Sequence, residues 1–438
     1  MAYDILEMVK NSGVVGAGGA GFPTHVKLNA RVKYVIVNGA ECEPLLRANQ
    51  QIMDIYSKEL WSTLKILLKE TGASFGVIAL KNKYKEAMAS LRRDKPKDEK
   101  LSITELGDFY PAGDEQVLVH EVTKIVVPEG SIPLKVGCVV INVETLLNVF
   151  FALEGMPVTH KFVTITGAVK NPITLKVPLG CKVKNLINLA GGAAIRNYKV
   201  IDGGPMMGSI ADDGVITKTT GGIIVLPENH KAANFNEISL RQSLIRARAA
   251  CCQCRICTDM CPRYLLGHDL EPHKIMRAVG FPEMGGAQLT NAYLCSECAV
   301  CDKFACPMGL SPRIIIKMLK SELNKAGIKN THLRTNLLPQ EGRNWRKIAS
   351  SRLISRLGLE EYDLPAPIVN MKINPEEVCI SLKQHIGEPA LPVVNVGDKV
   401  EFGQLIGVMP EKGLGANIHA SISGIVAELN ENLLIKRL

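Results

Sequence analysis

The sequence predicts a multidomain protein of mixed α/β and α+β class, with several folded units connected in series. Three observations predict this. The chain has 438 residues, and a domain takes roughly 100–200 residues. Thirteen cysteines are present, and nine of them crowd into residues 251–306. A run of glycines lies near the N-terminus, whereas the C-terminal end alternates short apolar segments with glycine-containing turns, which is typical of strands.

The composition excludes several classes of function. The formal net charge is +9, but no Lys/Arg block concentrates it and aromatic residues make up only 5%, so we predict no nucleic-acid binding. No apolar run approaches the roughly 20 residues of a membrane span, and the N-terminus lacks the apolar core of a signal peptide. Clustered cysteines without a disulfide framework indicate a reducing compartment. We therefore expect a cytoplasmic protein with no direct membrane span.

The cysteines form two motifs of nearly equal spacing. The first, C-x2-C-x2-C-x3-C-P, begins at Cys251, and the second, C-x2-C-x2-C-x4-C-P, begins at Cys295. Such runs hold [4Fe–4S] clusters: three thiolates wrap one cluster, and the fourth cysteine, before proline, reaches the other cluster. One cluster is therefore assigned to Cys251, Cys254, Cys257 and Cys306. The other is assigned to Cys295, Cys298, Cys301 and Cys261.

A pair of structural zinc sites is the alternative for these motifs. Zinc sites present two separated C-x2-C pairs, and three closely spaced cysteines, found twice, favour iron–sulfur clusters instead. Clusters of this kind transfer one electron each and make no bonds, so we expect no catalytic side chain. Cys252 is predicted to be a packed thiol rather than a ligand. The isolated cysteines predicted to be buried thiols are Cys42, Cys138, Cys181 and Cys379.

The glycine-rich stretch GAGGAG at residues 16–21 satisfies the G-x-G-x-x-G pattern of dinucleotide-binding folds. Its context argues against a standard Rossmann loop, because residues 4–10 before it predict an amphipathic helix and not a strand. A strand is predicted after it, at Tyr34–Val37. Small residues with free backbone N–H groups make a cradle for phosphate, and a tight packing loop is the alternative.

Three later segments accompany this stretch in order: NGAECEP at 38–44, YPAGDE at 110–115 and NVET at 142–145. Together the four segments resemble the flavin-binding domain that the FMN subunit of respiratory complex I shares with the RnfC subunit of the Rnf complex. The resemblance continues through the cysteine motifs to the C-terminus. It implies FMN as a cofactor and NADH as the electron donor.

The resemblance also implies roles for particular residues. The glycines expected to lie against the flavin and NADH are Gly16, Gly18, Gly19 and Gly21. Phe22 would stack on the nucleotide, and Lys27 would balance phosphate charge. The residues that match the remaining flavin-binding stretches are Asn38, Glu41, Glu43, Tyr110, Gly113, Glu115, Asn142 and Thr145. Ala40 and Asp114 depart from the family pattern, so one hydrogen-bond acceptor for the flavin is missing.

The units follow one another along the chain. We expect a Rossmann-like FMN/NADH-binding domain at 1–156, a β-grasp (SLBB) module at 157–238, a two-cluster ferredoxin-like helical domain at 239–334, a connector without clear pattern at 335–375 and an RnfC-like barrel-sandwich hybrid domain at 376–438. The loop at 203–208 is expected to face the flavin domain without a catalytic role. His385 and His419 are predicted to be structural.

The order of the units bears on function, because RnfC carries its barrel-sandwich domain ahead of the flavin domain and here it comes last. This order resembles the cobalamin reductases of propanediol-utilisation microcompartments. It implies an NADH-dependent oxidoreductase that passes electrons through FMN and two [4Fe–4S] clusters to cob(III)alamin or cob(II)alamin. A corrinoid adenosyltransferase and microcompartment shell proteins are the partners implied. Two alternatives stay open: an RnfC-type subunit of a membrane-bound ferredoxin:NAD oxidoreductase, and a non-enzymatic iron–sulfur carrier without flavin.

Overall fold

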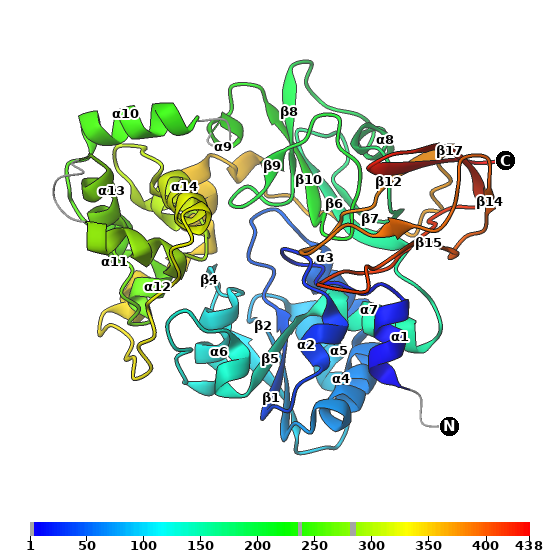
Figure 1. The fold of residues 1–438 in the computed structure, drawn as a ribbon, viewed down its shortest axis with the longest axis horizontal. Helices are drawn as coiled ribbons and strands as arrows, with labels where there is room; N and C mark the ends of the chain where they lie inside the picture. The colour runs from blue at the N-terminus through cyan, green and yellow to red at the C-terminus, as the bar shows by residue number, and fades with distance from the viewer. Residues whose placement is uncertain (1–3, 235–238, 281–285) are drawn as a thin grey trace.

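The N-terminal unit is built on a parallel sheet in the order β3-β2-β1-β5. The computed structural model describes residues 4–234, 239–280 and 286–438 (Figure 1). The strands of this sheet are β1 (Tyr34–Gly39), β2 (Phe75–Lys81), β3 (Leu101–Leu106) and β5 (Cys138–Asn142). The helices around it are α1 (Ile5–Asn11), α2 (Thr24–Leu28), α3 (Ala48–Ile55), α4 (Ser57–Thr71), α5 (Lys85–Asp94), α6 (Glu115–Thr123) and α7 (Val143–Leu153).

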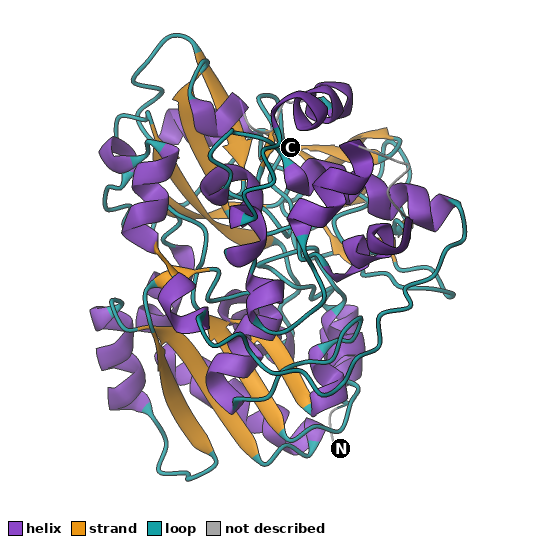
Figure 2. Cartoon of the chain, turned by 90° about the vertical axis from the view of Figure 1, so that its left-hand side faces the viewer, coloured by secondary structure: helices purple, strands orange, loops and turns teal. Residues whose placement is uncertain are grey.

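The apolar run of β1 explains why this sheet is buried on both faces (Figure 2). Successive side chains of a strand point to opposite faces. Val35 and Val37 pack into the core with α3, α4, α5 and α7, whereas Ile36 packs on the other face with α6. The predicted Rossmann-like sheet is therefore confirmed. The exclusion of a standard Rossmann loop also holds, because the glycine stretch connects α1 to α2 and follows no strand.

The next unit is a mixed sheet in the order β7-β6-β10-β8-β9. Its strands are β6 (His160–Gly167), β7 (Ile173–Pro178), β8 (Tyr198–Asp202), β9 (Ser209–Ile210) and β10 (Gly222–Pro227), and α8 (Val183–Leu189) and α9 (Lys231–Asn234) accompany them. Strands β6 and β10 run parallel, and β6 pairs antiparallel with β7. The boundary predicted at residue 238 lies outside the described residues.

The C-terminal segment forms two facing sheets, in the orders β12-β18-β17-β14 and β13-β15-β16. Their strands are β12 (Glu377–Ser381), β13 (Leu391–Pro392), β14 (Lys399–Val400), β15 (Leu405–Val408), β16 (Ile418–His419), β17 (Gly424–Leu429) and β18 (Asn432–Lys436). One hydrophobic cluster joins Val163 and Ile165 of β6 to Val426 and Ile435 of this segment. The two β units therefore share a core, which was not predicted.

A helical unit carries the cysteines, on the side of the molecule opposite the C-terminal sheets (Figure 1). It contains α10 (Leu240–Ala250), α11 (Ile256–Asp259), α12 (Pro262–Leu265), α13 (Pro272–Gly280) and α14 (Pro312–Lys325), with a 3₁₀ helix η3 (Gly286–Leu294) and a π-helical turn η4 (Val300–Ala305). Ser239 and Gln242 form a capping box that starts α10, and this helix ends at the first cysteine motif. No helix among the described residues is long and apolar enough to cross a membrane.

The connector predicted to lack regular structure contains a short strand and a helix. Strand β11 (Ile348–Ala349) pairs antiparallel with β4 (Phe109–Tyr110), and α15 (Ser350–Leu357) follows it. The apolar face of α15 is Leu353, Ile354 and Leu357, all buried. The spacing i, i+1, i+4 is a helical signal, so the prediction of no pattern was wrong here.

Candidate functional site

A cleft of about 600 Å³ opens at the carboxyl ends of β1 and β5. Asn38 and Asn142 lie directly opposite each other in the parallel register, one at each strand end. The chain adds β2 and β3 on one side of β1 and β5 on the other, so the strand order reverses here. Crevices at such switch points are where open α/β sheets bind ligands. The predicted residues that line the cleft are Gly18, Gly19, Asn38, Glu41, Glu43, Tyr110, Gly113 and Asn142.

The glycine loop is held against the start of α7. Thr145 accepts a hydrogen bond of 2.9 Å from the Ala17 N–H, and Asn142 caps α7 by accepting from the N–H groups of Glu144 and Thr145. A Cβ at Gly18 would lie 2.7 Å from the Asn142 amide nitrogen, so this position has no room for a side chain. A Cβ at Gly19 would meet nothing within 4 Å. Gly19 is therefore open towards the cleft.

The carboxylates of Glu41 and Glu43 are both occupied by backbone N–H groups. Glu41 accepts from Asn49 and Gln50, at 2.8 and 3.2 Å, at the first turn of α3. Glu43 accepts from Met206 and Met207, at 2.8 and 3.0 Å, and so holds the 203–208 loop over the cleft. Burial raises the pKa of both carboxyls. These side chains shape the cleft walls, which differs from the free acceptors that the family pattern implied.

Six predicted residues do not line the cleft: Gly16, Gly21, Phe22, Lys27, Glu115 and Thr145. The Lys27 ammonium lies 2.8 Å from Glu115 and 3.1 Å from the Val140 carbonyl, so a nearby carboxylate already balances its charge. Gly16 donates its N–H to the Phe22 carbonyl and closes the base of the glycine loop. In the described structure these residues build the loop and its support, and the role of Lys27 in balancing phosphate charge stays a prediction.

Residues of the β-grasp unit complete the cleft, and the family stretches did not point to them. Lys161 of β6 lies in the cleft wall and forms a buried ion pair with Glu144 of α7. Asp202 also lines it, and burial raises the pKa of Asp202 to about 6. The expectation that the 203–208 loop faces the flavin domain is confirmed, because Gly203, Gly204 and Met207 are cleft residues. A Cβ on Gly204 would lie 2.1 Å from the Glu43 carboxylate, which explains the glycine there.

The motif cysteines meet in two separate pockets. One is lined by Cys251, Cys254, Cys257 and Cys306, and the other by Cys261, Cys295, Cys298 and Cys301. These are the two groups that the crossover of the fourth cysteine predicts. Four cysteines that line one pocket supply the donor set of a [4Fe–4S] cluster.

The two motif loops repeat one backbone conformation. Residues Gln253 and Arg255 of the first loop, and Glu297 and Ala299 of the second, have φ between 55° and 69°. These left-handed residues stand at matching positions between the cysteines and curl each loop around its pocket. Burial raises the pKa of Cys257 and of Cys261 to about 12. Metal binding needs thiolate ligands and therefore releases these protons.

The remaining cysteines divide into two kinds. Cys252 is exposed at the first pocket, so the prediction of a packed thiol is wrong there. Cys138 and Cys181 are buried as expected, and Cys42 and Cys379 are half-buried. The Cys42 sulfur accepts the Gly113 N–H at 2.6 Å in the cleft wall, and burial raises its pKa to about 11. Cys42 therefore acts as a hydrogen-bonded wall residue in the described structure.

The cleft and the second cysteine pocket share a wall. Ser296 and Cys298 line both cavities. Arg263, which also lines the second pocket, forms a buried ion pair of 2.5 Å with Asp114 of the cleft. Asp114, which departs from the family pattern, thus joins the two units and also caps α6.

Family models match four parts of the chain. They are the Nuo51 FMN-binding domain over residues 9–150, the SLBB domain over 162–209, the 4Fe-4S dicluster domain over 250–311 and the RnfC barrel sandwich hybrid domain over 361–437. The chain therefore contains an FMN-binding domain and a two-cluster iron–sulfur domain, as expected from the sequence.

The chain is also similar to several whole proteins. The chain is 43% identical over 435 residues to the cobalamin reductase PduS of Citrobacter freundii, covering 98% of this chain and 95% of that protein. It is 44% identical over 438 residues to PduS of Salmonella typhimurium, covering 99% and 96%. One subunit of the Na(+)-translocating ferredoxin:NAD(+) oxidoreductase complex of Acetobacterium woodii is 34% identical over 269 residues, 60% of this chain and 58% of that one. A chain of an NAD+-reducing [NiFe]-hydrogenase matches with a TM-score of 0.47 at 18% identity, covering 77% of this chain and 63% of that one. The chain belongs to the family of the PduS cobalamin reductases.

Proposed function

We propose that this chain takes electron pairs from NADH and delivers single electrons to an oxidised corrinoid, cob(III)alamin or cob(II)alamin. The observation that carries this proposal is the position of Cys298, which lies in the wall of the cleft and of the second cysteine pocket. Bound FMN exchanges two electrons with NADH and one at a time with a cluster, and the protein supplies binding, orientation and electrostatics.

The cleft residues have distinct tasks in this proposal. The backbone N–H groups of Gly18 and Gly19, two exposed residues that line the cleft, offer donors for phosphate. Asn142 lies in the cleft at the end of β5, where its amide orients the flavin, whereas the Asn38 amide is hydrogen-bonded to Gly113 and Ala40 and supports the cleft wall. Glu43 holds the 203–208 loop as a cover that excludes water.

The eight motif cysteines are proposed as thiolate ligands, four to each cluster. The cluster of Cys295, Cys298, Cys301 and Cys261 is then next to the flavin. The cluster of Cys251, Cys254, Cys257 and Cys306 is the exit, because Cys254 and the adjacent Cys252 are exposed at its pocket. Electrons would leave through this surface to the corrinoid.

The relatives named cobalamin reductase support a corrinoid as the acceptor. A corrinoid adenosyltransferase, which would consume the reduced corrinoid, and microcompartment shell proteins are the protein partners we propose, with the microcompartment as the location. Because the chain is also similar to one subunit of a ferredoxin:NAD(+) oxidoreductase complex, ferredoxin is tested as a second acceptor.

The test is anaerobic purification with cofactor analysis, followed by NADH titration and then addition of cob(III)alamin. We expect one FMN and about eight irons per chain, joint bleaching of the flavin and cluster bands by NADH, and corrinoid reduction. Cysteine ligation is checked by the Cys298→Ala variant, which should keep FMN and lose corrinoid reduction. Reduction of ferredoxin but not of corrinoid would support the RnfC-type alternative. Iron without FMN, or flavin that NADH leaves oxidised, would support the non-enzymatic carrier.

A further inference from the structure

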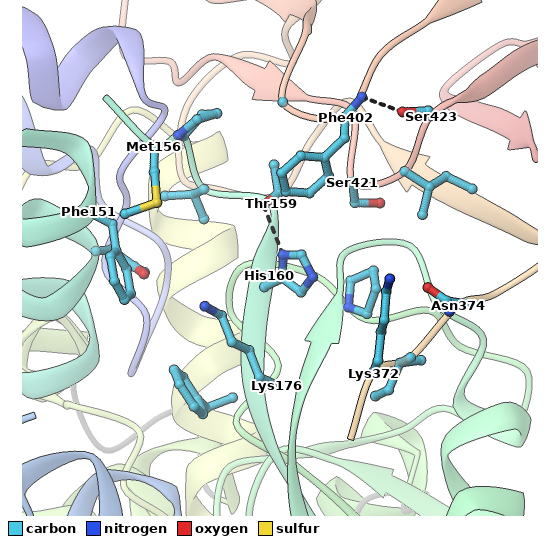
Figure 3. Close-up of a pocket in the computed structure, with 18 of the residues that line it drawn as sticks. Phe151, Met156, Thr159, His160, Lys176, Lys372, Asn374, Phe402, Ser421 and Ser423 are labelled. Atoms are coloured by element: carbon cyan, nitrogen blue, oxygen red, sulfur yellow. Dashed lines mark hydrogen bonds between the residues drawn. The ribbon is translucent and has the colours of Figure 1, made fainter. Parts of the chain in front are cut away.

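A second cavity, of about 950 Å³, lies between the N-terminal unit, the β-grasp sheet and the C-terminal sheets (Figure 3). Its walls come from the end of α7, residues 155–160, strands β6 and β7, the 370–374 segment and the turns at 402–403 and 421–423. None of its lining residues belongs to the flavin cleft or to a cysteine pocket. It is therefore a separate cavity, and its volume falls within the range of ligand pockets.

Strand β6 separates this cavity from the flavin cleft. Lys161 lines the cleft, whereas its neighbours His160 and Phe162 line the second cavity. This follows from the alternation of side chains along a strand. The two cavities thus lie on opposite sides of one strand, and the Glu144–Lys161 ion pair belongs to the partition between them.

The charged side chains that line the second cavity all carry positive charge. They are Lys176, Lys372 and Arg437, and the lining contains no Asp or Glu. In the described part of the chain neither Lys176 nor Lys372 forms an ion pair, whereas other lysines, such as Lys27 and Lys83, have a carboxylate within 3.0 Å. The Lys176 ammonium lies instead 4.8 Å from the centroid of the Phe151 ring. Burial lowers the pKa of Lys176, which an anion in the cavity would reverse.

Flat and apolar surfaces face these cations. Figure 3 shows Lys176 and Lys372 reaching up from the floor of the cavity, with the ring of Phe402 above them. Phe402 is 56% exposed and Met156 is 47% exposed, so both present apolar surface to the cavity. The Phe402 backbone is held by a 2.9 Å hydrogen bond from its N–H to Ser423, and its ring meets His160 edge-on at 5.8 Å. These two contacts hold Phe402 at the cavity.

We propose that this cavity binds a nucleotide, that is, a flat heteroaromatic base that carries phosphate. Multivalent phosphate matches a lining with three cationic side chains and no Asp or Glu side chain, and Lys176 and Lys372 are its proposed ligands. A flat base matches the Phe402 ring, because stacked aromatic rings attract each other beyond the effect of their buried area. Asn374 adds an amide that can read the edge of a base. This site is additional to the NADH and FMN of the cleft.

The experiment must separate this site from the cleft, because FMN and NADH are nucleotides too. The FMN-loaded protein is titrated with ADP, with pyrophosphate and with adenosine by calorimetry, in the absence and presence of saturating NADH. The test variant is Lys176→Gln/Lys372→Gln, and Lys170→Gln is the matched control, an exposed lysine that lies in the turn after β6 and outside the cavity. A third variant, Phe402→Ala, removes the stacking face.

We expect ADP to bind when NADH is present. The double lysine variant should bind ADP about tenfold more weakly or worse, because it lacks the charge-assisted contacts to phosphate. Lys170→Gln should bind as the parent protein does. Phe402→Ala should weaken ADP but leave pyrophosphate unchanged. FMN content and NADH bleaching report folding, and should match the parent in every variant. The proposal is overturned if ADP does not bind, if NADH displaces it, if the double variant binds as tightly as the parent, or if Phe402→Ala has no effect on ADP.

Discussion

The Tyr110 hydroxyl donates a hydrogen bond of 2.7 Å to the backbone carbonyl of Cys298. It ties the wall of the flavin cleft to the loop of the second cysteine motif, and so links the two proposed redox sites directly. Burial raises the pKa of Tyr110 well above its ordinary value, so the hydroxyl stays protonated and remains a donor.

Tyr110→Phe should keep the FMN content and slow cluster reduction. The variant leaves the Cys298 carbonyl without its donor, which loosens the loop and destabilises the protein by about 1 kcal/mol. We expect an unchanged FMN to protein ratio, a lower unfolding midpoint and slower bleaching of the cluster bands in stopped-flow mixing with NADH. Unchanged cluster kinetics at reduced stability would show that the hydrogen bond has only a structural role.

Cys306→Ala and Cys261→Ala should remove different clusters. Cys306 lies in the pocket of the first motif and Cys261 in the pocket of the second, opposite to their order in the sequence. Iron analysis should fall to about four per chain in each variant. EPR of the reduced proteins should show that Cys261→Ala loses the cluster next to the flavin, with corrinoid reduction abolished. Loss of the sequence-local cluster in each case would contradict the crossover.

Glu43→Ala should open the cover of the cleft. Its carboxylate accepts two backbone N–H groups of the 203–208 loop, and removal leaves both without a partner at a cost of about 2–4 kcal/mol. We expect lower FMN occupancy and faster hydrogen exchange at Met206 and Met207. Glu43→Gln keeps an acceptor oxygen and is the matched control, with occupancy between the two. Equal occupancy in all three proteins would exclude the loop from flavin binding.

Gly19→Ala should lower the affinity for ligand without lowering the stability of the protein. The added methyl group meets no protein atom within 4 Å, so the thermal midpoint of the cofactor-free protein should not change. If the backbone approaches FMN or NADH here, affinity should fall about tenfold, because only glycine allows that approach. Gly18→Ala is the comparison, and should lower both stability and affinity, since its methyl group would displace Asn142. Unchanged affinity of Gly19→Ala for both ligands would remove Gly19 from the site.

Acid should weaken the attachment of the C-terminal sheets. Burial, with the positive charge of Lys218 adding to it, lowers the pKa of His385 to about 4 and of His419 to about 3. Between these values and the ordinary 6.5 the unfolded chain binds more protons than the folded one, so stability falls as pH drops from 6.5 towards 4. Thermal midpoints at several pH values should show this slope, and it should be smaller in His385→Gln/His419→Gln. An equal slope would refute the assignment, since acid loss of clusters affects both proteins alike.

The structure confirms the predictions that rest on spacing along the chain. The two cysteine motifs line separate pockets. The two-residue gaps and the left-handed residues between the cysteines curl each loop locally around its own pocket. The parallel sheet follows from the apolar strand that starts at Tyr34. The helix α15 was predictable as well, from Leu353, Ile354 and Leu357, although these residues fall in the segment predicted to be a connector.

Sequence by itself determined the class of this protein, because motif order and cysteine spacing depend on local geometry. Only the tertiary structure decided what each polar side chain does. Glu41 and Glu43 match a flavin-binding pattern, yet distant backbone N–H groups occupy their carboxylates, and Lys27 pairs with Glu115. The second cavity was decided in the same way, since its walls come from residues 148–178 and 370–438, which are far apart in the sequence. A buried charge is satisfied by whichever group packing brings near, and that choice cannot be read from neighbours in the chain.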